Sequence, residues 1–423
     1  MSFLASNIKS LLAIKIKTRH DSYTDQVSRI AVAKMFIVAS VVMGIDWFHD
    51  TVACMPPQDT TLSDDFIHSS CWIKGFYVYP DMAKHMRSSG YYGIPKDLKD
   101  DGVWNTTGSL CSTESTMTYM RAACVPMQKH FFTQYQWMPF FVSSLSLVFY
   151  IPYLLFRVAN TDMISLRLNL KNTTVDANVV LKNYFNHEIN SVAKMRLRIF
   201  VNLLIKCLYV VVNIGSFVLL DLFLNHHYFN YGVQWIRWAR DNTSLSMDFD
   251  RRTAPTPGNA MLPTFGMCDI HEARLDTVKA YKNRVKMICE ISSNILYQYV
   301  FLVLWFVLII SITASCLGIL LNIGGHVLTI ACFCKNSKTA RYVYKYLTLR
   351  ECEYLEFIRR KDLALYGDVL RLLYQSKVTK VVDREKMLDD ADGVEADRLV
   401  LASAPSNHPT PLMFRMHSIE SNI

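Results

Sequence analysis

Four long apolar blocks constrain the fold of this chain more than any other feature of its sequence. They cover residues 30–48, 137–156, 199–224 and 295–321 and are separated by long polar stretches. A helix rises about 1.5 Å per residue, so each block is long enough to cross a hydrocarbon layer of roughly 30 Å. Because an unpaired backbone group in lipid costs several kcal/mol, each block must be helical. The sequence therefore predicts an all-α polytopic membrane protein with four transmembrane helices in each subunit.

The fourth block gives the clearest signal. No Asp, Glu, Lys or Arg occurs between Glu290 and Lys335. This stretch is longer than a single crossing requires. We expect Gly324 and Gly325 to end the span, with the residues that follow lying along the membrane surface.

The first block is the least apolar of the four. Its charge-free window between Lys34 and Asp46 is only eleven residues long, so this helix is better placed among other helices or beside water than against lipid. Basic residues interrupt the apolar residues that precede it, which argues against a cleavable signal peptide. The first span is expected to act as the uncleaved targeting signal.

The distribution of charge predicts the orientation. Residues 157–198 contain seven Lys or Arg against three acids, whereas residues 50–135 contain seven against nine. Cytoplasmic loops carry the excess of positive charge, so both termini and the middle loop are predicted to be cytoplasmic. The predicted division is an N-terminal segment 1–27, first span 28–49, outer loop 50–136, second span 137–158, cytoplasmic loop 159–198, third span 199–224, outer loop 225–290, fourth span 291–322, helical C-terminal cytoplasmic domain 323–388 and flexible tail 389–423.

The cysteines are consistent with this orientation. Six of the eleven fall in the two outer loops, and an even number in an oxidising compartment indicates three disulfides, for which fifteen pairings exist. We expect Cys111 and Cys124 to pair with each other. Both outer loops also contain a glycosylation sequon, at Asn105 and Asn242. The six outer cysteines are Cys54, Cys71, Cys111, Cys124, Cys268 and Cys289.

Composition argues against several other functions. The formal net charge is +9, but Lys and Arg are spread over every polar segment, which favours contact with anionic membrane lipids over binding to nucleic acid. His271-Glu272 begins like a zinc-protease motif, but the second His is missing, and no phosphate-binding glycine loop occurs. We expect no catalytic residue, no metal site and no cofactor.

A short motif at the start of the second span indicates a family. Tyr135-Gln136-Trp137-Met138-Pro139-Phe140 resembles the YQWVPF signature of innexins, the invertebrate gap-junction proteins, with Met in place of Val. Further segments that resemble the family, in chain order, are Cys54 with Pro56 and Pro57, Phe66, Cys71-Trp72, Lys206-Cys207-Leu208-Tyr209 with Asn213, Met267-Cys268-Asp269, Cys289 and Gly367-Asp368 with Leu370.

The resemblance implies an assembly and a disulfide pattern. Innexin-like subunits form an octamer-like ring around a wide aqueous pore, and two rings on apposed cells dock through their outer loops. The family's cysteines link the first loop to the second, which here involves Cys54, Cys71, Cys268 and Cys289. Cys111 and its expected partner Cys124 are additional to that pattern.

The resemblance also implies that the first helix lines the pore and that the N-terminal segment folds into its cytoplasmic mouth. Charged residues there would form rings around the pore and set selectivity. The alternative for the lysines is binding to anionic lipid, and for Asp46 an ordinary position at the end of a helix. In the third span, Lys206 and Asp221 are expected to reach opposite membrane surfaces. The candidate pore residues are Lys9, Lys15, Lys17, Lys34 and Asp46.

The leading hypothesis is a homo-oligomeric gap-junction channel in the plasma membrane, which docks with a ring on the neighbouring cell and is open to mixing with other innexins. One alternative is an unpaired, pannexin-like hemichannel, favoured by the sequons and by the additional cysteines. Another is a non-conducting four-span adhesion or scaffold protein, although the loop signatures of tetraspanins and claudins are absent.

Overall fold

The computed structural model describes most of the chain, in two compact units. The first unit comprises residues 1–165 and 197–328, and the second comprises residues 166–196 and 329–423. The described residues are 22–49, 52–56, 62–80, 103–104, 110–111, 126–171, 175–242, 256–275, 280–332 and 338–376.

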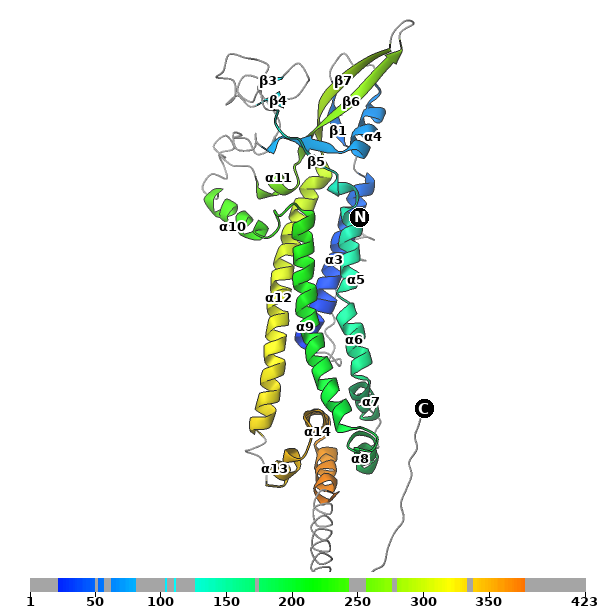
Figure 1. Cartoon of the computed structure of the whole chain (residues 1–423), viewed down its shortest axis with the longest axis vertical. Coiled ribbons are helices and arrows are strands. Elements are labelled where there is room, and N and C mark those ends of the chain that lie inside the picture. Colours follow the sequence, from blue (N-terminus) through cyan, green and yellow to red (C-terminus); the bar gives the residue numbers. More distant parts are fainter. Residues whose placement is uncertain are drawn as a thin grey trace, which may run out of the picture. The chain divides into compact units, whose positions relative to one another are not determined.

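Four helical spans run through the first unit (Figure 1), and each contains a stretch long and apolar enough to cross a membrane. The all-α, four-span prediction is therefore confirmed. The first span consists of α2 (Tyr23–Gln26), the π-helical turn η1 (Val27–Val32) and α3 (Ala33–His49). The second is α5 (Met138–Val148) with α6 (Ile151–Ala159), the third is α9 (Val192–Phe223) and the fourth is α12 (Ser292–Cys332).

The fourth helix differs from the prediction. We expected Gly324 and Gly325 to end it, but α12 continues through both glycines to Cys332. Neither glycine adopts a positive φ, which among the described glycines occurs only at Gly75. A glycine inside a helix costs about 1 kcal/mol relative to alanine, which does not end a helix when the flanking residues favour it. The expectation that the span ends there was wrong.

Beyond the outer ends of the spans, both predicted outer loops contribute to one five-stranded antiparallel sheet. Its strand order is β1-β7-β6-β2-β5. The first loop supplies β1 (Ala53–Met55), β2 (Phe76–Val78) and β5 (His130–Phe132), and the second supplies the hairpin of β6 (Phe265–Leu275) and β7 (Ala280–Glu290). We call this sheet, together with helix α4 (Asp64–Lys74), the cap.

The remaining outer elements are short. Helix α10 (Tyr231–Asn242) and helix α11 (Pro257–Met261) belong to the second loop, and strand β3 (Val103–Trp104) pairs with β4 (Leu110–Cys111) in the first. A single buried apolar cluster continues from the spans into the cap. It includes Phe36 of α3, whose ring lies 5.4 Å from that of Phe149, and extends to the cap cysteine Cys268.

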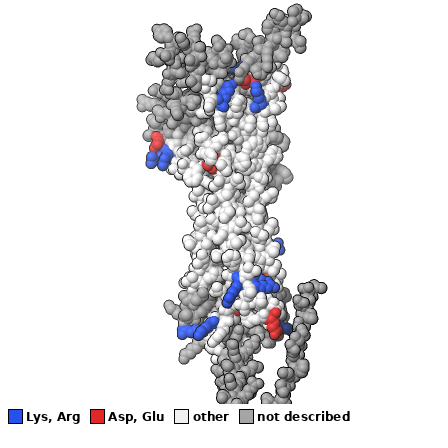
Figure 2. Space-filling model, viewed as in Figure 1, with Lys and Arg blue, Asp and Glu red and all other residues white. Residues whose placement is uncertain are grey.

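The surface of the first unit agrees with a membrane environment. Figure 2 shows that the middle of the helical bundle is largely free of charged side chains on the face in view. Leucines, valines and phenylalanines are exposed there instead, including Val211, Leu219 and Leu320. Such a broad exposed apolar belt indicates a surface that water does not cover.

The second unit is helical. It contains α8 (Ala177–Tyr184), α13 (Lys338–Lys345), α14 (Leu349–Lys361) and a helix over residues 363–376, while α7 (Thr161–Asn169) lies at its boundary. A capping box starts α14, with reciprocal hydrogen bonds between Thr348 and Glu351. The ring of Tyr354 packs edge-on against that of Tyr184 at 5.8 Å. The predicted flexible tail, residues 389–423, lies outside the described residues.

Candidate channel-forming site: the cap and the first span

Two disulfides join the outer loops. Cys54 is bonded to Cys289 and Cys71 to Cys268, so each bond links the first loop to the second, as the resemblance implies. Cys54 and Cys289 are direct partners on β1 and β7, with Cα atoms 3.9 Å apart. All four sulfur atoms are bonded in pairs, so these cysteines cross-link the loops and offer no thiolate to a metal. The cap is therefore one cross-linked body rather than two independent loops.

The predicted pair of Cys111 and Cys124 remains a prediction. Cys111 belongs to strand β4, but its side chain lies outside the described residues, and so does Cys124. Asn105 is likewise outside the described residues, whereas Asn242 is the last residue of α10, with its side chain not described.

A buried carboxylate, which we did not single out from the sequence, holds the two loops together beside the disulfides. Asp269, next to Cys268 on β6, accepts a 2.6 Å hydrogen bond from the Tyr77 hydroxyl. Its second oxygen forms a 2.8 Å ion pair with Lys129, whose ammonium also lies 3.8 Å from the centre of the Tyr77 ring. Lys74 donates to the Asp269 carbonyl oxygen. Three groups of the first loop thus converge on one residue of the second, which satisfies a charge that burial would otherwise penalise.

The family signature has a structural role at the base of the cap. The hydroxyl of Tyr135 and the side-chain amide of Gln136 both donate 2.6 Å hydrogen bonds to the carbonyl oxygen of Trp72, near the end of α4. Helix ends leave such carbonyls without a partner inside the helix. Burial raises the pKa of Tyr135 well above its ordinary value, so its phenol stays neutral and remains a donor.

The rest of the signature begins the second span. Trp137 packs edge-on against Phe223 at the end of α9, with ring centres 5.2 Å apart. Pro139 lies in the first turn of α5, where a missing N–H costs nothing, and its carbonyl accepts a 2.9 Å hydrogen bond from Ser40 of α3. Phe140 is exposed on the bundle surface. The signature therefore couples α4, the first span and the third span at the outer end of the bundle.

A buried ion pair anchors the start of the first span. Asp25 of α2 pairs with Lys206 of α9, and both side chains are almost fully buried. Lys206 also donates a 2.8 Å hydrogen bond to the hydroxyl of Ser22. We expected Lys206 to reach a membrane surface, and this was wrong because an acid on another helix offers a buried partner. The pairing spans 181 residues of sequence, so spacing within the third span could not reveal it.

Asp221 lies near the outer end of the third span, and its expected reach to a membrane surface stays a prediction. Its carboxylate accepts hydrogen bonds from the backbone N–H groups of Tyr228 and Phe229, at 3.0 and 2.8 Å. His226 lies 3.0 Å from its other oxygen. Asp221 therefore stabilises the turn between α9 and α10, in which Asn225 and His226 both have positive φ.

About two turns along α9 from Lys206, an amide connects three helices. The side-chain nitrogen of Asn213 donates to Ser28 at 2.9 Å and to Ser315 at 3.0 Å, and its oxygen accepts from Ser311 at 2.6 Å. Polar groups inside a membrane bundle hold helices together when they are mutually satisfied. Ser28 lies in the π-helical turn η1, and π-turns are often functional. The inner half of the first span is thus fixed to α9 and α12 by polar contacts.

The candidate pore residues lie on the first span or before it. Lys34 is half-buried on α3. Asp46 belongs to the last turns of α3, but its side chain lies outside the described residues, as do Lys9, Lys15 and Lys17 entirely.

Comparison with known proteins identifies the family. A sequence model of the innexin family matches residues 21–385. The chain belongs to the innexin family. Among similar proteins, innexin inx3 of Drosophila melanogaster is 22% identical over 378 residues, which cover 86% of this chain and 82% of that protein. Innexin inx4 of the same organism is 22% identical over 293 residues, 67% of this chain and 69% of that protein.

Innexins form gap-junction channels. This innexin is therefore a subunit of an oligomeric, large-pore channel that passes ions and small molecules between adjacent cells, and its place is the plasma membrane at gap junctions. The four spans and the cross-linked outer loops are the parts that such a channel needs.

Proposed function

We propose that copies of this innexin assemble into an octameric ring and that the cap docks with the cap of a ring on the apposed cell. The observation that carries the docking proposal is the shared sheet, because both loops contribute strands and two disulfides cross-link them. Docking requires a surface that already holds its shape, since ordering flexible loops at the moment of contact reduces affinity. The Asp269 cluster adds a third link between the same loops.

Four helices of one subunit cannot surround a wide aqueous pore, so conduction needs a closed ring of copies. We assign the pore-facing position to the first span, which has the shortest charge-free window of the four blocks. Lys34 and Asp46 on this span, together with Lys9, Lys15 and Lys17 before it, are the proposed charge rings. Other innexins are proposed as partners in mixed rings, and a channel of this kind requires no catalytic group.

Currents between paired cells test the docked function. Pairs of communication-deficient cells that both express the full chain are expected to show junctional current, whereas a pair with one expressing partner is not. Current that appears only across the single membrane of an isolated cell, and never between pairs, would overturn docking.

The unpaired hemichannel is the second candidate, and the sequons at Asn105 and Asn242 favour it because a glycan on a docking face would block apposition. Asn105→Gln and Asn242→Gln variants separate the two functions. If pairs conduct only when both sequons are removed, the native channel works unpaired. If pairs conduct with glycans in place, the docked channel stands.

A further inference from the structure

Helix α10 and Phe229, two residues before it, have an apolar face that the described residues leave exposed. Phe229, Val233 and Ile236 are 65%, 37% and 55% exposed, and their spacing places them on one side of the helix. On another side, Tyr231 and Trp235 are buried against α12. α10 therefore has one face buried in the protein and another that exposes large apolar side chains.

Packing against α12 fixes where α10 lies along the bundle. The indole N–H of Trp305 donates to the Phe229 carbonyl at 3.2 Å, and the Tyr231 hydroxyl donates to the Gln298 carbonyl at 3.0 Å. Gly232 touches the Trp305 ring so closely that an added Cβ would lie 2.2 Å from it. The start of α10 is therefore held level with the segment of α12 between Gln298 and Trp305.

This level coincides with a change in the character of α12. On the outer side, Asn294 and Gln298 are buried and donate hydrogen bonds to the carbonyls of Pro263 and Leu262, which are polar surroundings. On the inner side, α12 exposes apolar residues along its length. The outer end of the charge-free stretch therefore packs against the second outer loop.

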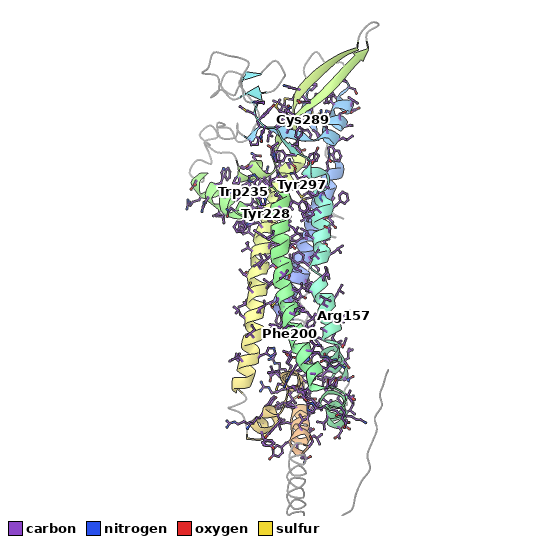
Figure 3. All side chains as sticks on the ribbon, viewed as in Figure 1. Arg157, Phe200, Tyr228, Trp235, Cys289 and Tyr297 are labelled. Atoms are coloured by element: carbon purple, nitrogen blue, oxygen red, sulfur yellow. A yellow bond between two sulfur atoms is a disulfide. The ribbon has the colours of Figure 1, made fainter. Side chains whose placement is uncertain are left out.

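The part of α12 on the inner side of α10 is long enough to cross a bilayer. From Trp305 to Leu328, the end of the candidate span, it rises about 35 Å, more than the roughly 30 Å of the hydrocarbon layer. Figure 3 shows Cys289 on the cap side of Tyr228 and Trp235, and Phe200 and Arg157 far toward the other end. A hydrocarbon layer therefore fits along α12 on the inner side of α10.

We propose that α10 is an interfacial helix whose exposed apolar face is embedded in the outer leaflet of the cell's own membrane. The occupant of this face is phospholipid, with acyl chains against Val233 and Ile236 and phosphates near Arg237. Three observations favour lipid over a second copy of the chain.

First, Leu222 and Phe223 at the outer end of α9, shortly before α10, also expose apolar side chains. Second, α10 carries two tryptophans and exposed arginines, a composition typical of helices at membrane surfaces. Third, Figure 1 shows α10 leaving the bundle at a steep angle to α9 and α12 rather than parallel to them. A helix in that direction at the level of the headgroups lies in the plane of the interface.

Photocrosslinking tests this surface in the assembled channel. The photoreactive residue p-benzoylphenylalanine replaces Ile236 in the full chain, and the purified ring is reconstituted in vesicles of radiolabelled phosphatidylcholine. Gln234 is the matched control, because it is exposed on the same helix but outside the apolar face. We expect the radiolabel to be several-fold higher on the subunit labelled at position 236 than on the one labelled at 234.

Equal lipid labelling at the two positions would overturn the proposal. Covalent subunit dimers formed from position 236 would also overturn it and would assign the face to a second copy. Gel filtration before irradiation shows whether each variant assembles. If the Ile236 variant does not, the same substitution at Val233 takes its place, with the same two outcomes.

Discussion

The pair of Asp25 and Lys206 shows what single residues contribute to this bundle. Each is a charge that lipid and apolar side chains would exclude, and each is tolerated because the other lies beside it. Removing one partner from a buried ion pair leaves an uncompensated charge, whereas removing both is often nearly neutral. The main contribution of the pair is therefore to fix the position of the start of the first span on α9. Its net contribution to the free energy of unfolding is small.

Lys206→Met is expected to destabilise the protein by about 3–5 kcal/mol, because Asp25 would remain buried without a counter-charge. The double variant Asp25→Asn with Lys206→Met should recover most of that loss. Thermal melting of the detergent-purified protein measures both, with Arg157→Met as the control because Arg157 is exposed. A double variant as unstable as the single one would contradict the pairing.

Cys352 in the second unit gives a prediction for pH. Burial, with smaller contributions from Glu351 and Glu353, raises its pKa from 9.0 to about 12. The neutral thiol therefore adds stability below pH 9.0, and this contribution is lost as the pH rises through about 12. Iodoacetamide at mildly alkaline pH is expected to leave Cys352 unmodified in the folded protein and to label it in denaturant. Mass spectrometry of its peptide measures this, and equal labelling in both states would be contrary evidence.

Some residue roles could be predicted from the sequence and others could not. The loop cysteines Cys54 and Cys268 stand out because disulfides follow from cysteine count, compartment and family pattern. Asp269 and Lys206 lie in segments that resemble the family, but their roles could not be predicted, because their partners come from distant parts of the chain and only the fold brings them together.

At the scale of elements, the long helix α12 shows how hydropathy and helix ends differ. Hydropathy correctly predicted a membrane-crossing helix, since apolar length is a local property. It did not predict that the helix continues through Gly324 or that its outer end packs in the cap, since both depend on contacts with other elements. For the same reason, the π-turn η1 was not predicted. The break between α5 and α6 does have a local signal, because Pro152 in the first turn of α6 predicts a bend in the second span.

Glycine substitutions test the continuity of α12. Nothing lies within 4 Å of an added Cβ at Gly324 or Gly325, so Gly324→Ala with Gly325→Ala is expected to stabilise the helix by roughly 1 kcal/mol per site. Gly232→Ala is the contrasting variant, because its Cβ would collide with the Trp305 ring and lower the melting temperature. Thermal melting of the purified protein measures both effects. Loss of folding in the Gly324 and Gly325 variant would indicate a turn at that position.

At the scale of the whole molecule, docking depends on the cap as a unit. Cys71→Ser with Cys268→Ser removes one link between the loops and is expected to abolish junctional current between paired cells, because the cap then samples more conformations. Currents across a single membrane should persist, since the spans keep their own core. The control is Cys316→Ser, at an exposed thiol of α12 outside the cap. Unchanged junctional current in the double variant would show that this disulfide is not needed for docking.

The bond between Cys54 and Cys289 lies shortly beyond the end of α3 at His49 and just before the start of α12 at Ser292. It therefore links the outer ends of the first and fourth spans covalently. The spacing of these two outer ends is therefore expected to stay the same when the channel opens and closes.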